Sequence, residues 1–332
     1  PRLYGGTDTL LRHTLPKYGI ETTFVENPDD PASWQAAVRP NTKLFYGESI
    51  SNPLNDILDI PAIAEVAHRN QVPLVIDNTV ATPYLIRPLE LGADVVVSSA
   101  TKYLGGHGSS LGGVLVDGGK FDWRVQRDGQ DVFPSFTTPD PAYHGLVYAD
   151  LGAPALALKA RVTLLRDTGA AASPFNAWTL VQGIDTLSLR VERHVSNAQR
   201  IAEWLEARQD VSKVQYAGLA SSPYKELQKK LSPKGAGAIV TFDLAVPEGA
   251  SDEDVKAQSW KFIDALKLHS CLVNIGDVRS LVSHPATTTH SQGTAEGNAI
   301  AGVTLATVRL SVGIEAVEDI LADLVLGFAA LD

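Results

Sequence analysis

The 332-residue sequence predicts an α/β fold built around a mostly parallel sheet, with a smaller α/β domain at its C-terminal end. Short apolar runs alternate with segments rich in helix formers, which is the pattern of successive strand–helix–strand units. The composition, with 44% hydrophobic and 20% charged residues, is that of a globular protein. No apolar run approaches the roughly 18 residues that cross a bilayer, so the sequence predicts no membrane span.

Strands and helices alternate through the first half of the chain. Residues 43–48 predict a strand, and Asp59 is placed to cap a helix over 60–69 that has Pro61 in its first turn. Residues 72–77 form a continuous apolar run that ends in an acid, as expected for a strand buried on both faces of a parallel sheet. Further along, the sequence predicts a short helix over 85–91 and strands over 93–98 and 113–116.

The second half has a different organisation. Residues 118–151 carry Pro, Gly, Asp and aromatic residues without periodicity, which predicts a long loop or insertion. Residues 153–167 are rich in helix formers, and 176–208 predict one long helix that joins two halves. We therefore divide the chain into a large domain over 1–175, the connecting helix over 176–208 and a small domain over 209–332. The small domain is expected to contain strands over 236–244 and 307–312 and helices over 260–268 and 316–331.

The charge balance and the cysteine content limit which binding partners, metal sites and cellular compartments are expected. Lys and Arg number 28 against 38 Asp and Glu, a net charge of −10, and no basic cluster stands out. We therefore do not expect nucleic-acid binding. The single cysteine, Cys271, excludes an internal disulfide and a cysteine-based metal site, and it is consistent with a reducing cytoplasm. We expect a cytoplasmic protein without a metal site.

Two predicted strand ends carry chemically notable side chains. Asp77 ends the apolar run 72–77, where its charge needs a cationic partner. Lys102 follows the strand over 93–98 within a Ser/Thr cluster, where partial desolvation would lower its pKa and make the amine nucleophilic. Ligands of open α/β sheets bind at the carboxyl ends of the strands, so both side chains lie where a ligand is expected.

Pyridoxal 5′-phosphate (PLP) is a cofactor that uses both groups. A lysine binds it as a Schiff base, and a carboxylate pairs with its pyridine nitrogen and maintains the ring as an electron sink. Small hydroxyl residues near the lysine can bind the phosphate. The pattern leaves two other interpretations open, namely Asp77 as a helix cap or turn former and residues 99–102 as an ordinary loop after a strand.

Several segments of the chain resemble the Cys/Met metabolism family of PLP-dependent enzymes. The most specific is 99–108, Ser-Ala-Thr-Lys-Tyr-Leu-Gly-Gly-His-Gly, and the others are 3–7, 48–53, 75–79, 82–84, 284–290 and 308–313. The segments follow the order of the family from residue 3 to residue 313, so the resemblance covers essentially the whole chain. The resemblance implies the type I PLP-dependent transferase fold, of the aspartate-aminotransferase type, and a homotetramer of dimers that share active sites.

The resemblance also implies roles in cofactor binding. Lys102 is the Schiff-base lysine and the base that transfers protons, and Asp77 pairs with the pyridine nitrogen. Tyr4 stacks on the cofactor ring and belongs to the catalytic group. Ser99 and Thr101 bind the phosphate.

On the substrate side, the resemblance implies that Arg309 grips the substrate carboxylate, a task that suits a planar and permanently charged side chain. Asn52 and Ser280 help to orient that carboxylate. His107 and His290 lie inside matching segments without an assigned role, and structural hydrogen bonding is the favoured interpretation for both.

Two features indicate a branch within the family. The insertion over 118–151 resembles that of O-acetylhomoserine sulfhydrylases, which cystathionine synthases and lyases typically lack. Arg279 would repel the ammonium group of an amino-acid thiol, so sulfide is the favoured nucleophile. The expected reaction is a PLP-dependent γ-replacement in methionine biosynthesis, in which O-acetylhomoserine and sulfide give homocysteine and acetate.

Three alternatives compete with this interpretation. A cystathionine γ-synthase or γ-lyase has the same fold and differs in its nucleophile. A non-catalytic protein that retained the fold would have no need for Asp77, Lys102 and Arg309 together. An NAD-dependent dehydrogenase would carry a Gly-x-Gly-x-x-Gly turn after its first strand, and the sequence shows none in that context.

The beginning of the sequence departs from the family pattern. The family's phosphate-binding backbone turn, and a Tyr/Arg pair donated by a neighbouring subunit, precede the segment that matches 3–7. This sequence begins at Pro1 and contains no Met. We therefore expect that an N-terminal segment is missing from it, and that the 332 residues alone hold PLP weakly or not at all.

Overall fold

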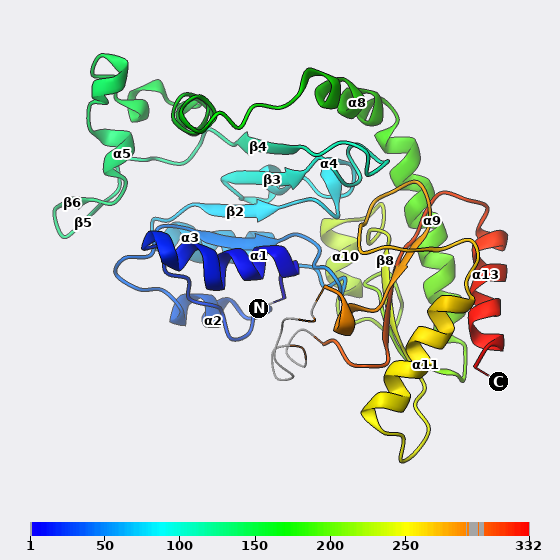
Figure 1. Ribbon diagram of the computed structural model, residues 1–332. Helices are drawn as coiled ribbons and strands as arrows, with labels where there is room; N and C mark the ends of the chain where they lie inside the picture. Colours follow the sequence, from blue (N-terminus) through cyan, green and yellow to red (C-terminus); the bar gives the residue numbers. More distant parts are fainter. Residues whose placement is uncertain (1, 290, 292–297, 299–301, 332) are drawn as a thin grey trace.

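Figure 1 shows the computed structural model, which describes residues 2–289, 291, 298 and 302–331. In these ranges the strands form a four-stranded sheet of order β1-β2-β3-β4, a five-stranded sheet of order β7-β8-β11-β10-β9 and a short hairpin. No helix within the described ranges is both long and apolar enough for a bilayer. His290 lies outside the described residues.

The first sheet is mostly parallel, as the sequence predicts. Its strands are β1 (Phe45–Glu48), β2 (Leu74–Asp77), β3 (Val95–Ser99) and β4 (Gly113–Asp117). Strands β1, β2 and β3 pair in parallel, and β4 pairs antiparallel with β3. Because parallel strands end on the same edge of a sheet, Glu48, Asp77 and Ser99 share that edge.

Local sequence explains the helix that follows β1. Helix α3 (Ile60–Arg69) begins after Asp59, whose carboxylate accepts the N–H of Ala62 at 3.3 Å. Pro61 lies in the first turn, where a missing N–H costs little. Ile63 on the inner face is completely buried. The predicted helix and its cap are confirmed.

The second sheet lies in the C-terminal half. Its strands are β7 (Val211–Gln215), β8 (Ile239–Leu244), β9 (Ser270–Cys271), β10 (Leu281–Ser283) and β11 (Thr307–Ser311). Strands β9 and β10 are parallel, and the other neighbours are antiparallel. The Thr241 hydroxyl of β8 donates to the carbonyl of Pro53 at 2.5 Å. This contact joins the second sheet to the loop that follows β1.

The strand predicted over 307–312 is confirmed as β11. Every residue of β11 is buried, because both faces of the strand are covered. Val308 and Leu310 belong to the apolar core. The polar residues Thr307, Arg309 and Ser311 instead bond Asp243, Asn52 and Gly276, respectively. The polar face of β11 is therefore an interior surface that adjoins the loop after β1.

The single helix predicted over 176–208 is two helices in the structure. Helices α8 (Pro174–Asp185) and α9 (Leu187–Glu206) meet at Thr186, whose φ of −108° and ψ of 8° leave the helical region. The hydroxyl of Thr186 accepts a hydrogen bond from Nε of Arg190 at 3.1 Å. No proline marks the break, which is why the local pattern predicts one helix.

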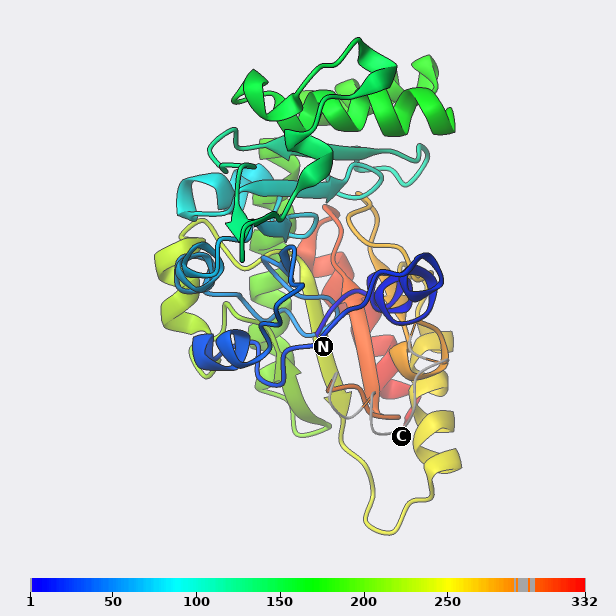
Figure 2. The same cartoon turned by 90° about the vertical axis from the view of Figure 1, so that its left-hand side faces the viewer.

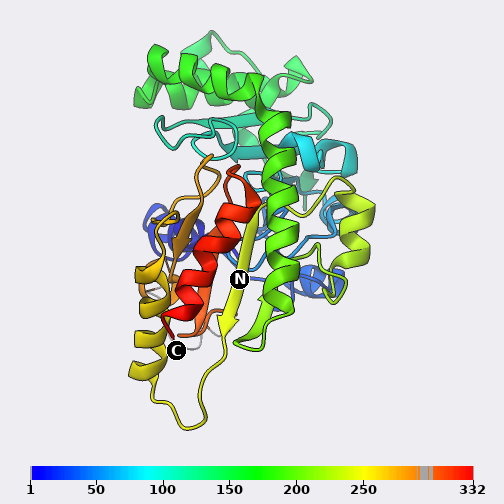
Figure 3. The same ribbon diagram turned by 90° about the vertical axis from the view of Figure 1, so that its right-hand side faces the viewer.

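Helices cover one face of the second sheet. Figure 3 shows α9, α11 (Asp252–Ala265) and α13 (Val317–Ala329) on this face. Helix α11 begins well before the predicted 260–268, because Ser251 and Asp254 form a capping box. The division of the chain into domains at 175 and 208 stays a prediction.

The predicted loop over 118–151 has short elements and an apolar cluster of its own. Its elements are β5 (Gln126–Arg127), β6 (Gln130–Asp131), α5 (Pro134–Thr137), η4 (Pro141–Tyr143) and η5 (Tyr148–Leu151). The rings of Trp123 and Phe136 stack with their centroids 4.1 Å apart. The segment lies at one end of the molecule, away from the second sheet (Figures 1 and 2).

The other helical segments are short. They are α1 (Gly5–Thr9), η1 (Leu10–Thr14), η2 (Leu15–Tyr18), α2 (Pro31–Ala36), α4 (Thr82–Leu85), η3 (Pro88–Leu91), α6 (Ala155–Lys159), η6 (Ala160–Leu165), α7 (Arg166–Thr168), α10 (Lys225–Leu231) and η7 (Pro285–Thr287). The helix predicted over 85–91 is replaced by α4 and η3. Pro88 keeps the preceding Arg87 out of the helical region, with φ −114° and ψ 84°.

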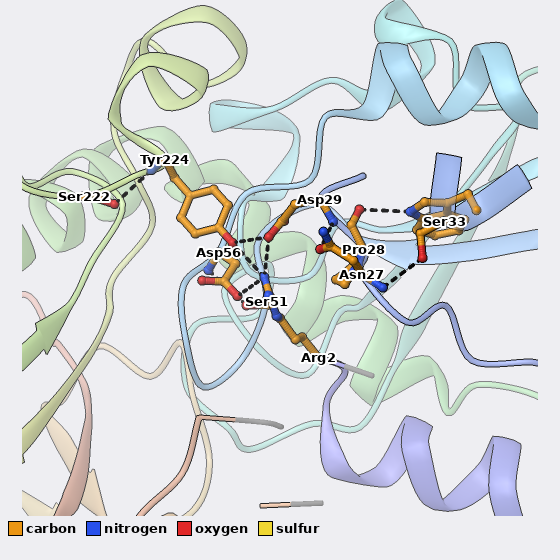
Figure 4. A network of polar contacts seen from close by, with 10 residues as sticks. Arg2, Asn27, Pro28, Asp29, Ser33, Ser51, Asp56, Ser222 and Tyr224 are labelled. Atoms are coloured by element: carbon orange, nitrogen blue, oxygen red, sulfur yellow. Dashed lines mark hydrogen bonds and ion pairs between the residues drawn. The ribbon is translucent and has the colours of Figure 1, made fainter. Parts of the chain in front are cut away.

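A polar network holds the start of the chain in place (Figure 4). Nη1 of Arg2 lies 2.8 Å from Asp29, 3.1 Å from Asp56 and 2.7 Å from the Tyr224 hydroxyl. Tyr224 also donates to Asp29 at 2.9 Å. The network links the start of the chain to three distant positions in the sequence and fixes the segment that carries Tyr4.

Candidate active site

Asp77, at the end of β2, is a carboxylate without a cationic partner among the described residues. It accepts hydrogen bonds from the Tyr46 hydroxyl at 3.3 Å and from the N–H of Thr79 at 2.9 Å. No ion pair to Asp77 is found among the residues that the structure describes. The carboxylate is therefore available to a cation that a ligand brings.

Lys102 lies in the turn that follows β3. Its amine donates a hydrogen bond to the side-chain carbonyl of Asn274, a neutral partner. Burial lowers the pKa of Lys102, and the charge of Arg309 lowers this pKa further. A larger fraction of the amine is therefore unprotonated near neutral pH, as a nucleophile requires.

Arg309 is a cation buried on the central strand β11, with only 2% of its surface exposed. Nη1 donates to Oδ1 of Asn52 at 3.2 Å, and Nη2 donates to the carbonyl of Val273 at 2.7 Å. Its Nε–H is buried and has no acceptor within the described chain. Burial lowers the pKa of Arg309 to about 10. A buried guanidinium with a free N–H is suited to bind an anionic ligand group.

The N-terminal segment brings an aromatic residue to the same edge of the first sheet. The N–H of Tyr4 donates to Oε1 of Glu48 at 2.6 Å, and Glu48 is the register partner of Asp77. Tyr4 is 47% exposed, so its ring is not committed to the apolar core. An exposed ring in this place can stack on a planar ligand.

Hydrogen bonds join these groups into one cluster. The carbonyl of Asn274 accepts from Nη2 of Arg309 at 3.3 Å, which connects the lysine and the arginine. The N–H of Lys102 donates to the carbonyl of Ser99 at 3.2 Å, and Ser99 donates to the Thr79 hydroxyl at 2.8 Å. The structure thus brings together the predicted site residues Tyr4, Asn52, Asp77, Ser99, Lys102 and Arg309.

Two predicted site residues have other partners. The Thr101 hydroxyl exchanges hydrogen bonds with the backbone of Gly112 at 3.1 and 3.3 Å. Ser280 is completely buried, and its N–H and hydroxyl both donate to Glu315, at 2.7 and 3.0 Å. The phosphate role of Thr101 and the substrate role of Ser280 stay predictions.

Four polar side chains of the cluster were not predicted as site residues. One of them, Tyr46, bonds Asp77 and lies in no matching segment. Glu48 and Thr79 lie inside the matching segments 48–53 and 75–79, so those motifs could have identified them. Asn274 is 172 residues from Lys102 and lies in no matching segment, so the sequence offers no signal for it.

The donor set fits PLP. Lys102 supplies an amine of lowered pKa, and Asp77 supplies a carboxylate that can pair with a protonated ring nitrogen. The free Nε–H of Arg309 remains for the carboxylate of an amino-acid substrate. These residues lie on different strands and loops, and the fold brings them together.

We expect Glu48 to make stability fall as pH rises. Burial, and then the charge of Asp77, raise the pKa of Glu48 from 4.5 to about 8. Between these pH values the folded chain binds a proton that the unfolded chain has lost, so stability decreases with pH by at most about 1.4 kcal/mol per unit. Glu48→Gln removes this dependence, so the variant should gain stability relative to the native protein from pH 5 to pH 8.

Urea unfolding of the cofactor-free protein at pH 5, 6, 7 and 8 measures this difference. Glu65→Gln, at an exposed carboxyl on α3, is the matched control and should follow the native curve. Parallel curves for Glu48→Gln and the native protein would show that Glu48 is ionised in the folded state.

Comparisons with known proteins agree with the geometry. The profile of the family described as Cys/Met metabolism PLP-dependent enzyme matches residues 1–329. The chain is 65% identical over 331 residues to an O-acetyl-L-homoserine sulfhydrylase of Corynebacterium glutamicum, which covers 100% of this chain and 74% of that protein. It is 48% identical to the protein of the same name from Leptospira meyeri, over 97% of this chain and 72% of that protein.

Solved structures show the same fold. An O-acetylhomoserine (thiol)-lyase structure from Campylobacter jejuni superposes with a TM-score of 0.91 at 38% identity, over 99% of this chain and 75% of that one, and it contains a pyridoxyl-lysine phosphate. Cystathionine γ-lyase of Lactobacillus plantarum, complexed with L-serine, gives 0.82 at 32% identity over 99% and 74%. The predicted type I PLP-dependent fold is confirmed. The chain therefore belongs to the Cys/Met metabolism family of PLP-dependent enzymes.

Proposed function

We propose that this protein is an O-acetylhomoserine sulfhydrylase, which converts O-acetylhomoserine and sulfide into homocysteine and acetate in methionine biosynthesis. The observation that carries the proposal is the 65% identity, over the whole chain, to the Corynebacterium glutamicum protein of that name. A second relative of that name, from Leptospira meyeri, and a homocysteine synthase of Schizosaccharomyces pombe at 48% identity agree with it. The clustered amine, carboxylate and guanidinium support a catalytic rather than a structural protein.

PLP, when bound, supplies an electron sink that acidifies the substrate Cα–H. We assign Lys102 to hold the cofactor, and then to take the proton from Cα and to return protons to the product. Its lowered pKa suits this task, because a base must be unprotonated before it acts. Asp77 would pair with the ring nitrogen, Tyr4 would stack on the ring and Ser99 would bind the phosphate.

Arg309 and Asn52 are assigned to the α-carboxylate of the substrate. The hydrogen bond between them fixes the guanidinium, so binding does not have to order a flexible side chain. In the overall reaction the Cγ–O bond to acetate breaks and a Cγ–S bond to sulfide forms. Lys102 moves the protons that this exchange requires.

Arg279 distinguishes sulfide from an amino-acid thiol in this proposal. Its side chain is 71% exposed, and Nε lies 3.3 Å from Oδ1 of the buried Asp277. The adjacent N–H of Val278 donates to the carbonyl of Gly106 at 2.8 Å, so this segment contacts the turn that carries Lys102. A guanidinium near that turn would repel the ammonium group of cysteine.

The test offers sulfide or cysteine in parallel to the full-length protein with PLP and O-acetylhomoserine. We expect homocysteine from sulfide and little cystathionine from cysteine. Arg279→Glu should raise the ratio of cystathionine to homocysteine about 30-fold, since it replaces a repulsion of about 1 kcal/mol by an attraction of similar size.

The exposed Arg161→Glu is the matched control for Arg279→Glu and should leave the product ratio unchanged. Dominant cystathionine from the native protein would instead assign a cystathionine γ-synthase. No product from either nucleophile would overturn the proposed activity.

We also propose a cytoplasmic homotetramer. Phe175, Trp178 and Val181 on α8 are 66%, 59% and 53% exposed, and such an apolar surface favours self-association. The free Cys271 is compatible with a reducing compartment.

A further inference from the structure

We propose that Arg190 of α9 is a positioning residue that sets the place of the Lys102 amine by holding the turn 102–106 from behind. This role rests on the proposed function, because it concerns the lysine that acts in that reaction. The sequence alone gave no reason to select Arg190, which lies 88 positions after Lys102 in a helix.

Arg190 bonds the backbone directly after the lysine. Its Nη1 donates to the carbonyl of Tyr103 at 2.8 Å, and Nη2 donates to the carbonyl of Leu104 at 3.2 Å. Nη2 also donates to the carbonyl of Gly183 at 2.6 Å, and Nε donates to the Thr186 hydroxyl. One guanidinium therefore ties the turn to the junction of α8 and α9.

The buried charge of Arg190 lowers the stability of the folded protein. The residue is 6% exposed, and burial lowers its pKa. Its acceptors are carbonyls and a hydroxyl, and within the described ranges it forms no ion pair. A buried cation without a carboxylate costs folding free energy. The planar guanidinium of Arg190 carries several N–H groups, so it can bond two consecutive carbonyls at the same time. A neutral side chain of this size cannot do so.

The shape of the turn is matched to the guanidinium. A Cβ at Gly106, which has a φ of +77°, would overlap Arg190. A Cβ at Gly183 would overlap the carbonyls of Leu104 and Gly105. Both glycines thus permit the close approach of α8, α9 and the turn.

Contacts on the opposite side complete the support. The N–H of Val278 bonds the carbonyl of Gly106 at 2.8 Å, and Asn274 accepts from the Lys102 amine. The turn is therefore held between Arg190 and the segment 274–278. A base that moves a proton must stay within hydrogen-bond reach of it, and a displacement of about 1 Å can cost about 100-fold in rate.

The test compares Arg190→Lys with Arg193→Lys. Lysine keeps the positive charge but lacks the planar set of N–H donors. The control residue, Arg193, is exposed and lies three positions further on in the same helix. Arg190→Lys should lower kcat about 10- to 100-fold with a KM for O-acetylhomoserine within about threefold of native. Replacing the substrate Cα–H by deuterium should lower kcat by a larger factor in Arg190→Lys than in the native protein, because proton transfer becomes more rate-limiting in the variant.

Hydrogen exchange, which needs neither substrate nor PLP, tests this proposal independently of the proposed function. In the cofactor-free protein, hydrogen exchange over 100–108 should be faster in Arg190→Lys than in the native protein and unchanged in Arg193→Lys. Thr186→Val, which removes one acceptor of Arg190, should shift the exchange and kcat in the same direction by less. This milder variant keeps the test informative if Arg190→Lys folds poorly.

Unchanged exchange over 100–108 in Arg190→Lys would overturn the proposal whatever the activity. So would a loss of kcat without a larger isotope effect, since that points to general destabilisation. If the native protein makes no homocysteine, the proposed function fails, and the exchange experiment still decides whether Arg190 holds the turn.

Discussion

Lys102→Ala is expected to lower kcat for homocysteine formation by at least about 10³-fold, the largest effect of any single substitution in this chain. Lys102 is the amine that the structure places at the end of β3, with a lowered pKa and a neutral partner in Asn274. In the proposed function it both holds PLP and moves the protons at Cα, so alanine removes two tasks at once. The measurement is steady-state kinetics with sulfide at saturating PLP.

The control for Lys102→Ala is Lys229→Ala, at an exposed lysine of α10 that pairs with Glu226. This control should keep native kinetics. Borohydride should attach the cofactor covalently to the native protein, at the peptide that contains Lys102, and should fail to do so in Lys102→Ala. Labelling of a different lysine, or a kcat within tenfold of native, would refute the assignment of Lys102.

Arg309→Lys is expected to raise the KM for O-acetylhomoserine about 100-fold and to leave the KM for sulfide within about twofold. The guanidinium is buried, is fixed by Asn52 and Val273, and keeps a free Nε–H. A lysine cannot keep the bonds to Asn52 and Val273 and at the same time offer the donor that Nε–H provides. A charge-assisted hydrogen bond to a carboxylate contributes about 1.5–3 kcal/mol. Sulfide carries no carboxylate, so its binding should not depend on this donor.

Arg200→Lys, at an exposed arginine that pairs with Glu318, is the matched control and should change neither KM. The thermal unfolding of Arg309→Lys should be recorded first, because Arg309 also bonds backbone carbonyls. An equal rise in both KM values, or loss of PLP affinity alone, would show that Arg309 does not bind the substrate carboxylate.

The elements around Asp77 and Lys102 could be predicted because their signals are local. A continuous apolar run marks β2, and Asp59 with Pro61 two residues later marks the beginning of α3. The segments 75–79 and 99–108 are contiguous in the sequence, so the resemblance to PLP enzymes was visible in the residues themselves. The family match over 1–329 confirms that resemblance.

Other features gave misleading or absent signals. The alternation of 307–312 correctly predicts a strand, but it gives no sign that β11 is buried throughout and that Arg309 bonds Asn52 in the loop after β1. The helix predicted over 176–208 breaks at Thr186, where no proline or glycine stands.

Short motifs in the sequence were enough to predict the fold class, the PLP cofactor and the site residues Lys102, Asp77 and Arg309, because each motif is a run of neighbouring residues. The comparisons confirm the fold class and the cofactor, and the roles of the three residues stay predictions. The contact of Asn274 with Lys102, and the bonds of Arg190 to the turn after Lys102, become visible only in the folded chain. Such contacts join residues about 90 to 170 positions apart. They depend on how two sheets and a broken helix pack together, and packing of that kind leaves no periodic or compositional trace in the chain.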